Sequence, residues 1–193
     1  MSAKSVMIVG VGGQGTLLAS RLLGQAMISQ GFDVKVSEVH GMSQRGGSVV
    51  TYVKYGDKVF SPIVQEAEAD FIIAFEQLEA GRWIRYLKND GKMIINNQQI
   101  DPMPVVIGTA EYPQGIVENI EKEGVTTISL DALSLAVKSG SAKAVNVALI
   151  GVLANTMEFD KSIWTDAIKA TVPKKFLEMN LKAFDLGYNY KSL

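Results

Sequence analysis

The chain has 193 residues, including 18 Gly, 5 Pro, a single His and no Cys. This length is typical of one domain, so we expect a single domain over residues 1–193. The absence of Cys excludes disulfides, thiolate nucleophiles and Cys-ligated zinc or iron–sulfur sites within the chain. Its 19 Lys and Arg nearly balance 20 Asp and Glu, which argues against nucleic-acid and membrane-surface partners. No apolar run reaches the roughly 18 residues of a spanning helix, so we expect a soluble, cytoplasmic protein.

The first 40 residues have the pattern of a β-α-β unit. An apolar run at Val6–Val9 predicts a buried parallel strand, and apolar residues at helical spacing predict a helix over Thr16–Ser29 that ends at Gly31. The alternating, β-branched segment Val34–Glu38 predicts the second strand. Such a connection should be right-handed.

A loop and a hairpin are expected next. Residues His40–Gly47 are polar and glycine-rich. They precede a predicted strand over Val49–Tyr55, a turn at Gly56-Asp57 and a returning strand over Lys58–Ile63. The alternating acids that follow are expected in a solvated turn; they are Glu66, Glu68 and Asp70.

Strands and helices alternate through the rest of the chain. The expected strands are Asp70–Phe75, Lys92–Asn96 after a turn at Asn89–Gly91, Val105–Ile107 and Thr126–Ser129. The expected helices are Gln77–Lys88, Gly115–Glu123, Ala132–Lys138 behind the N-cap Asp131, Ala144–Met157, Lys161–Ala170 and Lys174–Leu186, with Gly187 ending the last one. The fold class is α/β: a Rossmann-like three-layer fold with a mostly parallel sheet, a β-hairpin and a C-terminal helical segment.

The segment Gly10-Val-Gly-Gly-Gln-Gly15 matches GxGxxG between a predicted strand and a predicted helix. Gly10 allows a tight turn, Gly12 lets a ligand approach the backbone, and Gly15 lets helix and strand pack closely. The helix N-terminus offers N–H groups to a phosphate, and Glu38 lies where a dinucleotide fold places its ribose-binding acid. The alternative is that the glycines, with Gln14, only form a tight turn.

A second loop should lie near the first, at the carboxyl edge of the sheet, where open α/β sheets bind ligands. It contains His40, Ser43, Gln44 and Arg45, followed by Gly46-Gly47. The Arg45 guanidinium would suit a phosphate or carboxylate, and His40 could titrate near neutral pH. The alternative is that Arg45 pairs with an acid of this chain and His40 is an ordinary rim residue. The sequence has no Ser-His-Asp set, Walker A motif or metal-ligand spacing.

Three segments together resemble one family: VGVGGQG at 9–15, SEVHGMSQRGGSVV at 37–50 and SPIV at 61–64. They are similar to the γ-type domain of 2-oxoacid:ferredoxin oxidoreductases, most of all to the small-subunit type that acts on indolepyruvate. Further matches are ADFIIAFEQLEA at 69–80 and the helix AVNVALIG at 144–151, whereas the Pro-rich middle matches least. The resemblance covers nearly the whole chain.

The resemblance implies that this chain is a cluster-free subunit of an enzyme that converts a 2-oxoacid and CoA to acyl-CoA and CO2 and reduces ferredoxin. Thiamine diphosphate, Mg2+ and 4Fe–4S clusters would belong to a large partner subunit, and CoA is a candidate ligand. Loop 40–48 would face the partner and the edge of the thiamine site. The glycine loop would form a polyphosphate-facing or interface turn from Gly10, Gly12, Gly13, Gln14 and Gly15. In isolation, an apolar patch could instead make the chain a homodimer.

Two other classes of function use the same residues. A free-standing NAD-dependent oxidoreductase would use the glycine loop and Glu38, although an obvious proton donor beyond His40 or a tyrosine is missing. A purely structural interaction subunit would retain the nucleotide fold without a ligand. The sequence of this chain does not indicate which 2-oxoacid the enzyme uses.

Overall fold

The computed structural model describes residues 3–41 and 46–191, which build a six-stranded sheet of order β2-β3-β1-β4-β5-β6. Strands β1, β4, β5 and β6 run parallel, and β3 runs antiparallel to both of its neighbours. The strands are β1 Lys4–Val11, β2 Asp33–His40, β3 Ser48–Gly56, β4 Ala69–Ala74, β5 Leu87–Asn96 and β6 Thr126–Leu130. The α/β class with a mostly parallel sheet is thereby confirmed.

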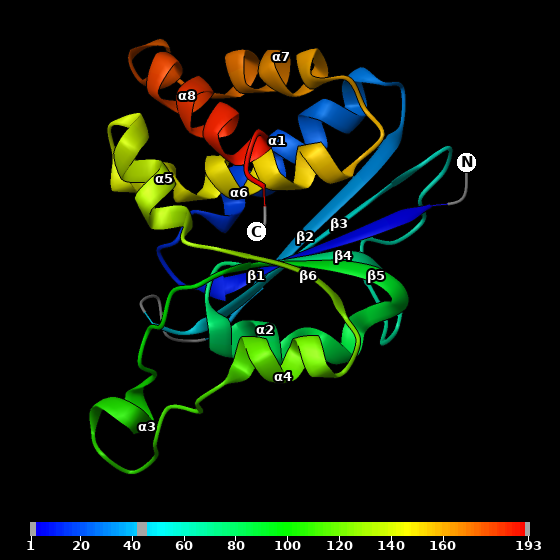
Figure 1. Cartoon of the computed structure of the whole chain (residues 1–193). Coiled ribbons are helices and arrows are strands. Elements are labelled where there is room, and N and C mark those ends of the chain that lie inside the picture. Colours follow the sequence, from blue (N-terminus) through cyan, green and yellow to red (C-terminus); the bar gives the residue numbers. More distant parts are fainter. Residues whose placement is uncertain (1–2, 42–45, 192–193) are drawn as a thin grey trace.

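Helices cover both faces of the sheet, which gives the expected three layers (Figure 1). On one side lie α1 Thr16–Ser29, α5 Ala132–Ser139, α6 Val145–Thr156, α7 Lys161–Thr171 and α8 Leu177–Tyr188. On the other side lie α2 Gln77–Trp83 and α4 Ile116–Lys122, while α3 Met103–Val106 sits on a projecting arm. None of the described helices is long and apolar enough to cross a membrane.

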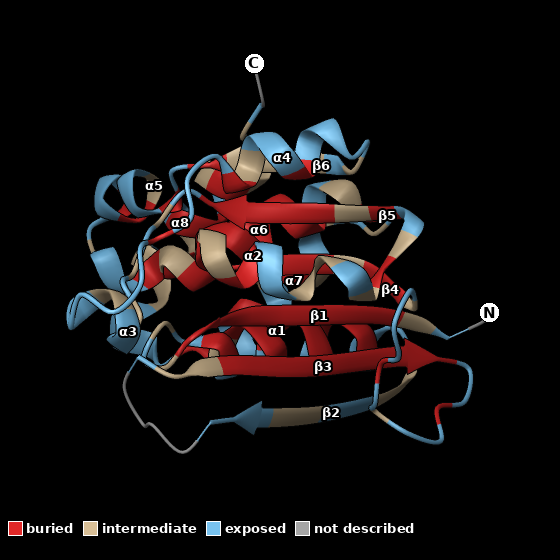
Figure 2. Ribbon diagram, turned by 90° about the horizontal axis from the view of Figure 1, so that it is seen from below, coloured by how far each residue is buried: buried red, intermediate tan, exposed pale blue. Residues whose placement is uncertain are grey.

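Strand alternation divides the core between the two faces. In β1, Val6 and Ile8 face the core under α1 and α6, whereas Met7 and Val9 face the core under α2 and α4. Figure 2 shows β1, β3, β4 and β5 as buried strands and β2 as the more exposed edge. The apolar run at Val6–Val9 therefore belongs to a strand covered on both faces, as expected.

The first unit of the fold differs from a simple β-α-β unit. Strand β3 lies between β1 and β2, so β2 does not pair with β1. The expected hairpin within 49–63 is wrong, because β3 pairs with β2 and residues 57–68, all described, form no strand. Instead, the segment after β3 is held at the sheet end by the Val59 amide, which donates to Asp33 Oδ2 at 2.9 Å.

Four smaller expectations are also wrong. The predicted helix Gln77–Lys88 ends early, at Trp83, and a 3-10 turn at Ile84–Tyr86 leads into β5. The predicted turn at Asn89–Gly91 falls inside β5. The predicted strand Val105–Ile107 overlaps helix α3, because Pro102 and Pro104 suit a helix start and provide no ladder N–H group. Gly187 lies within α8 rather than after it.

Gly187 and Gly151 allow α6 and α8 to cross at backbone contact. A Cβ at Gly187 would lie 1.9 Å from the Ala148 carbonyl oxygen, and one at Gly151 would lie 2.3 Å from the Phe184 carbonyl oxygen. Neither obstacle is a flexible side chain, so the helices themselves would have to move apart.

Asp70 is buried rather than solvated, which corrects the expected acidic turn. Its side chain is 8% exposed and accepts hydrogen bonds from Lys88 Nζ at 2.8 Å, the Ser5 amide at 2.8 Å and Lys4 Nζ at 2.9 Å. Burial alone would raise the pKa of Asp70, but these three bonds outweigh burial and hold the pKa below its ordinary value of 3.8. The carboxylate thus joins the starts of β1, β4 and β5.

Replacement of Gly187 by Ala should destabilise the fold by at least about 2 kcal/mol, because the helix crossing has no room for a methyl group. Urea unfolding checks this result. The matched control is Gly24→Ala in α1, where the nearest atoms to the new Cβ lie at ordinary contact distances of 3.8 and 3.9 Å. That variant should be neutral or up to about 1 kcal/mol more stable. Equal stabilities of the two variants would contradict the crossing.

The Asp70 carboxylate should make stability depend on acid. Because its folded-state pKa is lowered, its contribution is complete above about pH 4 and is lost as the pH falls through the folded pKa. We expect Asp70→Asn to be less stable than the wild type at pH 7 and the difference to shrink toward about pH 3, measured by urea unfolding. The control Asp166→Asn removes an exposed pair with Lys169 and should change little at either pH.

Candidate functional site

The glycine loop connects β1 to α1 at the carboxyl edge of the sheet, as predicted. Gly13 and Gly15 have φ angles of +101° and +82°, which other residues rarely adopt. A Cβ on Gly10 would lie 2.9 Å from Phe75 Cβ, and one on Gly15 would lie 2.6 Å from Asn146 Nδ2. Close packing therefore favours glycine at Gly10 and Gly15, and the positive φ favours it at Gly13 and Gly15, whatever the loop binds.

Gln14 fastens this turn to the neighbouring strands. Its Oε1 accepts the Val11 amide at 2.7 Å, and its Nε2 donates to the Phe75 carbonyl at 3.0 Å and to Gln98 Oε1 at 3.2 Å. The side-chain amide therefore bridges the ends of β1 and β4 and the segment after β5. Its polar groups are used within the protein.

The second loop meets the first through the backbone. The Gly12 amide donates to the Gly47 carbonyl at 2.9 Å, which brings the two glycine segments together as predicted. Gly46 has a φ angle of +77°. Ser43, Gln44 and Arg45 lie outside the described residues, so their predicted roles stay predictions.

Glu38 faces the start of α1 across a small cavity. Its Oε2 accepts Thr51 Oγ1 at 3.1 Å and Thr16 Oγ1 at 3.4 Å, and its Oε1 lies 3.4 Å from His40 Nδ1. The cavity has a volume of about 300 Å³ and is lined by Gly12, Gly13, Gly15, Thr16, Leu17, Glu38, His40, Gly41 and Val49. The structure thus gathers the glycine loop, Glu38 and His40 in one place, as the sequence predicted.

The charges of this cavity suit hydroxyl groups better than phosphates. None of its described lining residues is Lys or Arg. The positive partial charge at the α1 N-terminus already faces the Glu38 carboxylate, which would repel a phosphate placed there. A hydroxyl group could donate to Glu38, as the Thr16 and Thr51 hydroxyls do. Among the described residues, no group of three or more His, Asp or Glu could hold a metal ion.

Two buried acids at the same edge were missed by the sequence reasoning. Glu79, 4% exposed, accepts Ser48 Oγ, Arg82 Nε at 3.1 Å and Trp83 Nε1 at 3.1 Å, so it fastens the start of β3 to α2. Glu76, 1% exposed, accepts the Tyr112 hydroxyl and caps α2. Burial and then the Glu76 carboxylate raise the pKa of Tyr112, which keeps this phenol protonated. Only the i,i+3 and i,i+4 spacing of Glu79 to Arg82 and Trp83 carried a local signal.

Asn146 is another missed contributor. It is buried at the start of α6, and its Nδ2 donates to the Gly15 carbonyl at 3.2 Å. The two residues are 131 positions apart, so no local pattern indicates the contact.

Removal of the Gln14 side-chain amide should lower the stability of the protein. It should have little effect on ligand contacts. We expect Gln14→Ala to lower the free energy of unfolding by about 1–3 kcal/mol, because a buried amide and carbonyl lose their partners. Chemical denaturation measures this change. Gln99→Ala, which removes an exposed amide bound to Asp101, should have almost no effect. A neutral Gln14→Ala would refute the bridging role.

Comparisons with known proteins agree with this geometry. Residues 5–190 match the family described as pyruvate ferredoxin/flavodoxin oxidoreductase. The indolepyruvate oxidoreductase subunit IorB of Pyrococcus horikoshii is 44% identical over 192 residues, which cover 97% of this chain and 95% of the relative.

Solved structures share the fold. The γ subunit of a keto/oxoacid ferredoxin oxidoreductase from Geobacter sulfurreducens has a TM-score of 0.72 at 22% identity, over 96% of both chains. A 2-oxoglutarate:ferredoxin oxidoreductase from Magnetococcus marinus, solved with 2-oxoglutarate, coenzyme A and succinyl-CoA, has a TM-score of 0.73 at 17% identity over 97% of this chain and 31% of that one. From the match along nearly its whole length, the chain belongs to the pyruvate ferredoxin/flavodoxin oxidoreductase family.

Proposed function

We propose that this chain is the small subunit of an indolepyruvate:ferredoxin oxidoreductase. The observation that carries the proposal is the 44% identity to an indolepyruvate oxidoreductase subunit over 97% of this chain. The whole enzyme would join a 2-oxoacid to CoA with loss of CO2 and pass the released pair of electrons to ferredoxin. We place this reaction in the cytoplasm.

The chain needs a partner for this chemistry. It contains no Cys and therefore cannot hold an iron–sulfur cluster with thiolates. We propose that a large subunit carries the 4Fe–4S clusters, thiamine diphosphate and Mg2+, and that ferredoxin meets the complex there. Family membership favours this function over an NAD-dependent dehydrogenase, although both classes would use a glycine loop beside Glu38.

The carboxyl edge of the sheet is the proposed contact with this partner and with CoA. The Gln14 side chain and the Gly12 amide form their hydrogen bonds within the chain. This supports a preformed contact surface rather than a phosphate-binding site formed by this chain alone. The cavity beside Gly13 contributes Glu38 and the α1 N-terminus but no described cation. We therefore propose that it contacts CoA only as part of a site completed by the large subunit. Arg45 stays the sequence-predicted candidate for a phosphate of CoA.

Reconstitution tests the proposed function. The chain, co-expressed with a thiamine-binding large subunit from the same genome, should form a stable complex that reduces ferredoxin with indolepyruvate and CoA. Each subunit alone should be inactive, and NADH should show no saturable binding to this chain. A complex that forms but does not oxidise any aryl 2-oxoacid would overturn the substrate assignment, and saturable NADH binding would restore the dehydrogenase alternative.

A side chain introduced at Gly13 should test whether the carboxyl edge of the sheet contacts CoA or the partner. A Cβ at Gly13 meets nothing within 4 Å, and Asn is among the non-glycine residues that tolerate positive φ best, so Gly13→Asn should fold with some loss of stability from the φ of +101°. We expect it to raise the KM for CoA or the Kd of the complex by about tenfold, the scale of about 1.4 kcal/mol. Steady-state kinetics and subunit titration measure these quantities.

Gly31→Asn is the matched control for this variant. Gly31 also has a positive φ, of +83°, and open space around its Cβ, but it lies at the opposite end of α1. Its Asn variant should behave as the wild type. Wild-type kinetics and assembly for Gly13→Asn would place the CoA and partner contacts elsewhere.

A further inference from the structure

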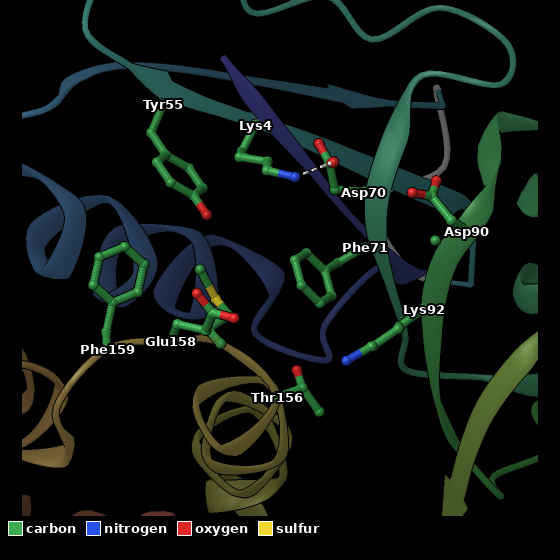
Figure 3. Close-up of a pocket in the computed structure, with 11 residues that line it drawn as sticks. Lys4, Tyr55, Asp70, Phe71, Asp90, Lys92, Thr156, Glu158 and Phe159 are labelled. Carbon is green, nitrogen blue, oxygen red and sulfur yellow. Dashed lines mark hydrogen bonds and ion pairs between the residues drawn. The ribbon is translucent and has the colours of Figure 1, made fainter. Parts of the chain in front are cut away.

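A second cavity opens at the opposite edge of the sheet, where the parallel strands begin. It has a volume of about 360 Å³, within the range of small-molecule sites. We call it the amino-end cavity and define it by Lys4, Tyr55, Phe71, Lys92, Thr156 and Glu158, which line it with several neighbours. Strands β1, β3, β4 and β5 supply one wall, and the end of α6 with the segment before α7 supplies the other (Figure 3). The amino-end cavity shares no residue with the cavity between Glu38 and the start of α1.

Tyr55 presents an unused hydroxyl group to the amino-end cavity. Its side chain is almost fully buried, at 2% exposure, yet the hydroxyl has no hydrogen-bond partner among the described residues. The ring is held by Phe32, with centroids 5.6 Å apart, and by Phe159, with centroids 6.5 Å apart. Figure 3 shows the hydroxyl directed into the open space. The hydroxyl oxygen opens onto the cavity and is not one of the sealed, unpaired polar atoms of the described residues, and the two ring contacts fix the direction in which it can donate to a ligand.

The charged side chains that line the cavity are Lys4, Asp70, Asp90, Lys92 and Glu158. Lys4 is bound to Asp70, which also binds Lys88, so these three groups are held to one another and carry one positive charge in excess. Lys92, half-buried on β5, has no ion-pair partner among the described residues, and neither have the two exposed acids, Asp90 on the same strand and Glu158 on the opposite wall. In Figure 3 the Lys92 ammonium and the Glu158 carboxylate approach the same space from its two walls.

The end of α6 adds to the negative side of this space. Thr156 is the last residue of this 12-residue helix, whose final turn carries no basic side chain. The partial negative charge of a helix C-terminus favours a cation, as the Glu158 carboxylate does. The cavity therefore offers the Lys92 cation and the Asp90 carboxylate on β5, and the Glu158 carboxylate on the opposite wall. Its apolar surfaces come from Phe71, Met157 and Phe159.

We propose that the amino-end cavity binds a free α-amino acid with an apolar side chain. The ligand carboxylate would bind Lys92, its ammonium group would bind Glu158 at the end of α6, and Tyr55 would donate its hydroxyl to a carboxylate oxygen. The side chain would pack between Phe71 and Phe159. A simple carboxylate would bring no cation to the acids Glu158 and Asp90, and a simple amine would bring no anion to Lys92, so a zwitterion matches the charges of the cavity best.

Calorimetric titration of the full chain tests the proposal. The probes are L-phenylalanine and L-leucine, with N-acetyl-L-phenylalanine and L-phenylalaninamide as analogues that lack one charge each. We expect saturable binding of at least one of the two amino acids. Each analogue should bind at least about tenfold more weakly than L-phenylalanine, because each loses one charge-assisted contact. Binding of an analogue as tight as that of L-phenylalanine would overturn the zwitterion assignment.

Three variants and two controls locate the site. Lys92→Met, Glu158→Gln and Tyr55→Phe should each weaken binding, by about tenfold for the two charged positions. The controls Lys122→Met and Glu121→Gln make the same replacements on α4, across the sheet, and should bind as the wild type does. Circular dichroism and thermal melting verify that the variants fold; Lys92→Met and Glu158→Gln alter groups outside the core. No binding by the wild type, or unchanged binding in these two folded variants, would overturn the proposal.

Discussion

The insertion of β3 between β2 and β1 determines where both cavities lie. Because β3 runs antiparallel through the middle of one half of the sheet, its first residue, Ser48, lies at the carboxyl edge and Tyr55 lies at the amino edge. The same strand places Thr51 beside Glu38, so that the Glu38 carboxylate faces the start of α1. A direct β1-β2 pair would separate the second glycine segment from the first, and the Gly12–Gly47 hydrogen bond would be lost.

The two edges differ in which polar groups remain free. At the carboxyl edge, Gln14 and Gly12 are engaged within the chain, and Glu38 accepts two hydroxyl groups. The polar groups of that edge are thus already bonded within the chain. This agrees with a subunit that needs a partner for its chemistry. At the amino edge, the Tyr55 hydroxyl has no hydrogen-bond partner and Lys92 has no ion-pair partner among the described residues, and both line the cavity. The amino edge therefore has polar groups free to bind a ligand within this chain, whereas those of the carboxyl edge are engaged.

Local sequence patterns were sufficient to predict many of the helices and strands. They were insufficient to predict which strands pair with each other. The apolar run at Val6–Val9, the Asp131 cap of α5 and the glycine turn were all predicted, because each depends on residues close together in sequence. The order of strands was not, since alternation in Ser48–Gly56 indicates a strand but not its neighbours. The burial of Asp70 depends on Lys4 and Lys88, and the packing of Gly15 depends on Asn146. Such contacts between distant residues produce no periodic pattern in the sequence.

The glycine loop shows why a motif match alone does not establish a cofactor. In a dinucleotide site the loop amides and the helix N-terminus face a pyrophosphate. Here the Gly12 amide is bound to Gly47, the Val11 amide is bound to Gln14, and a carboxylate faces the helix start. The same glycines therefore serve the packing of two loops against each other. A GxGxxG turn can thus be stabilised by bonds within the chain, without a Lys or Arg among the described residues that line its cavity.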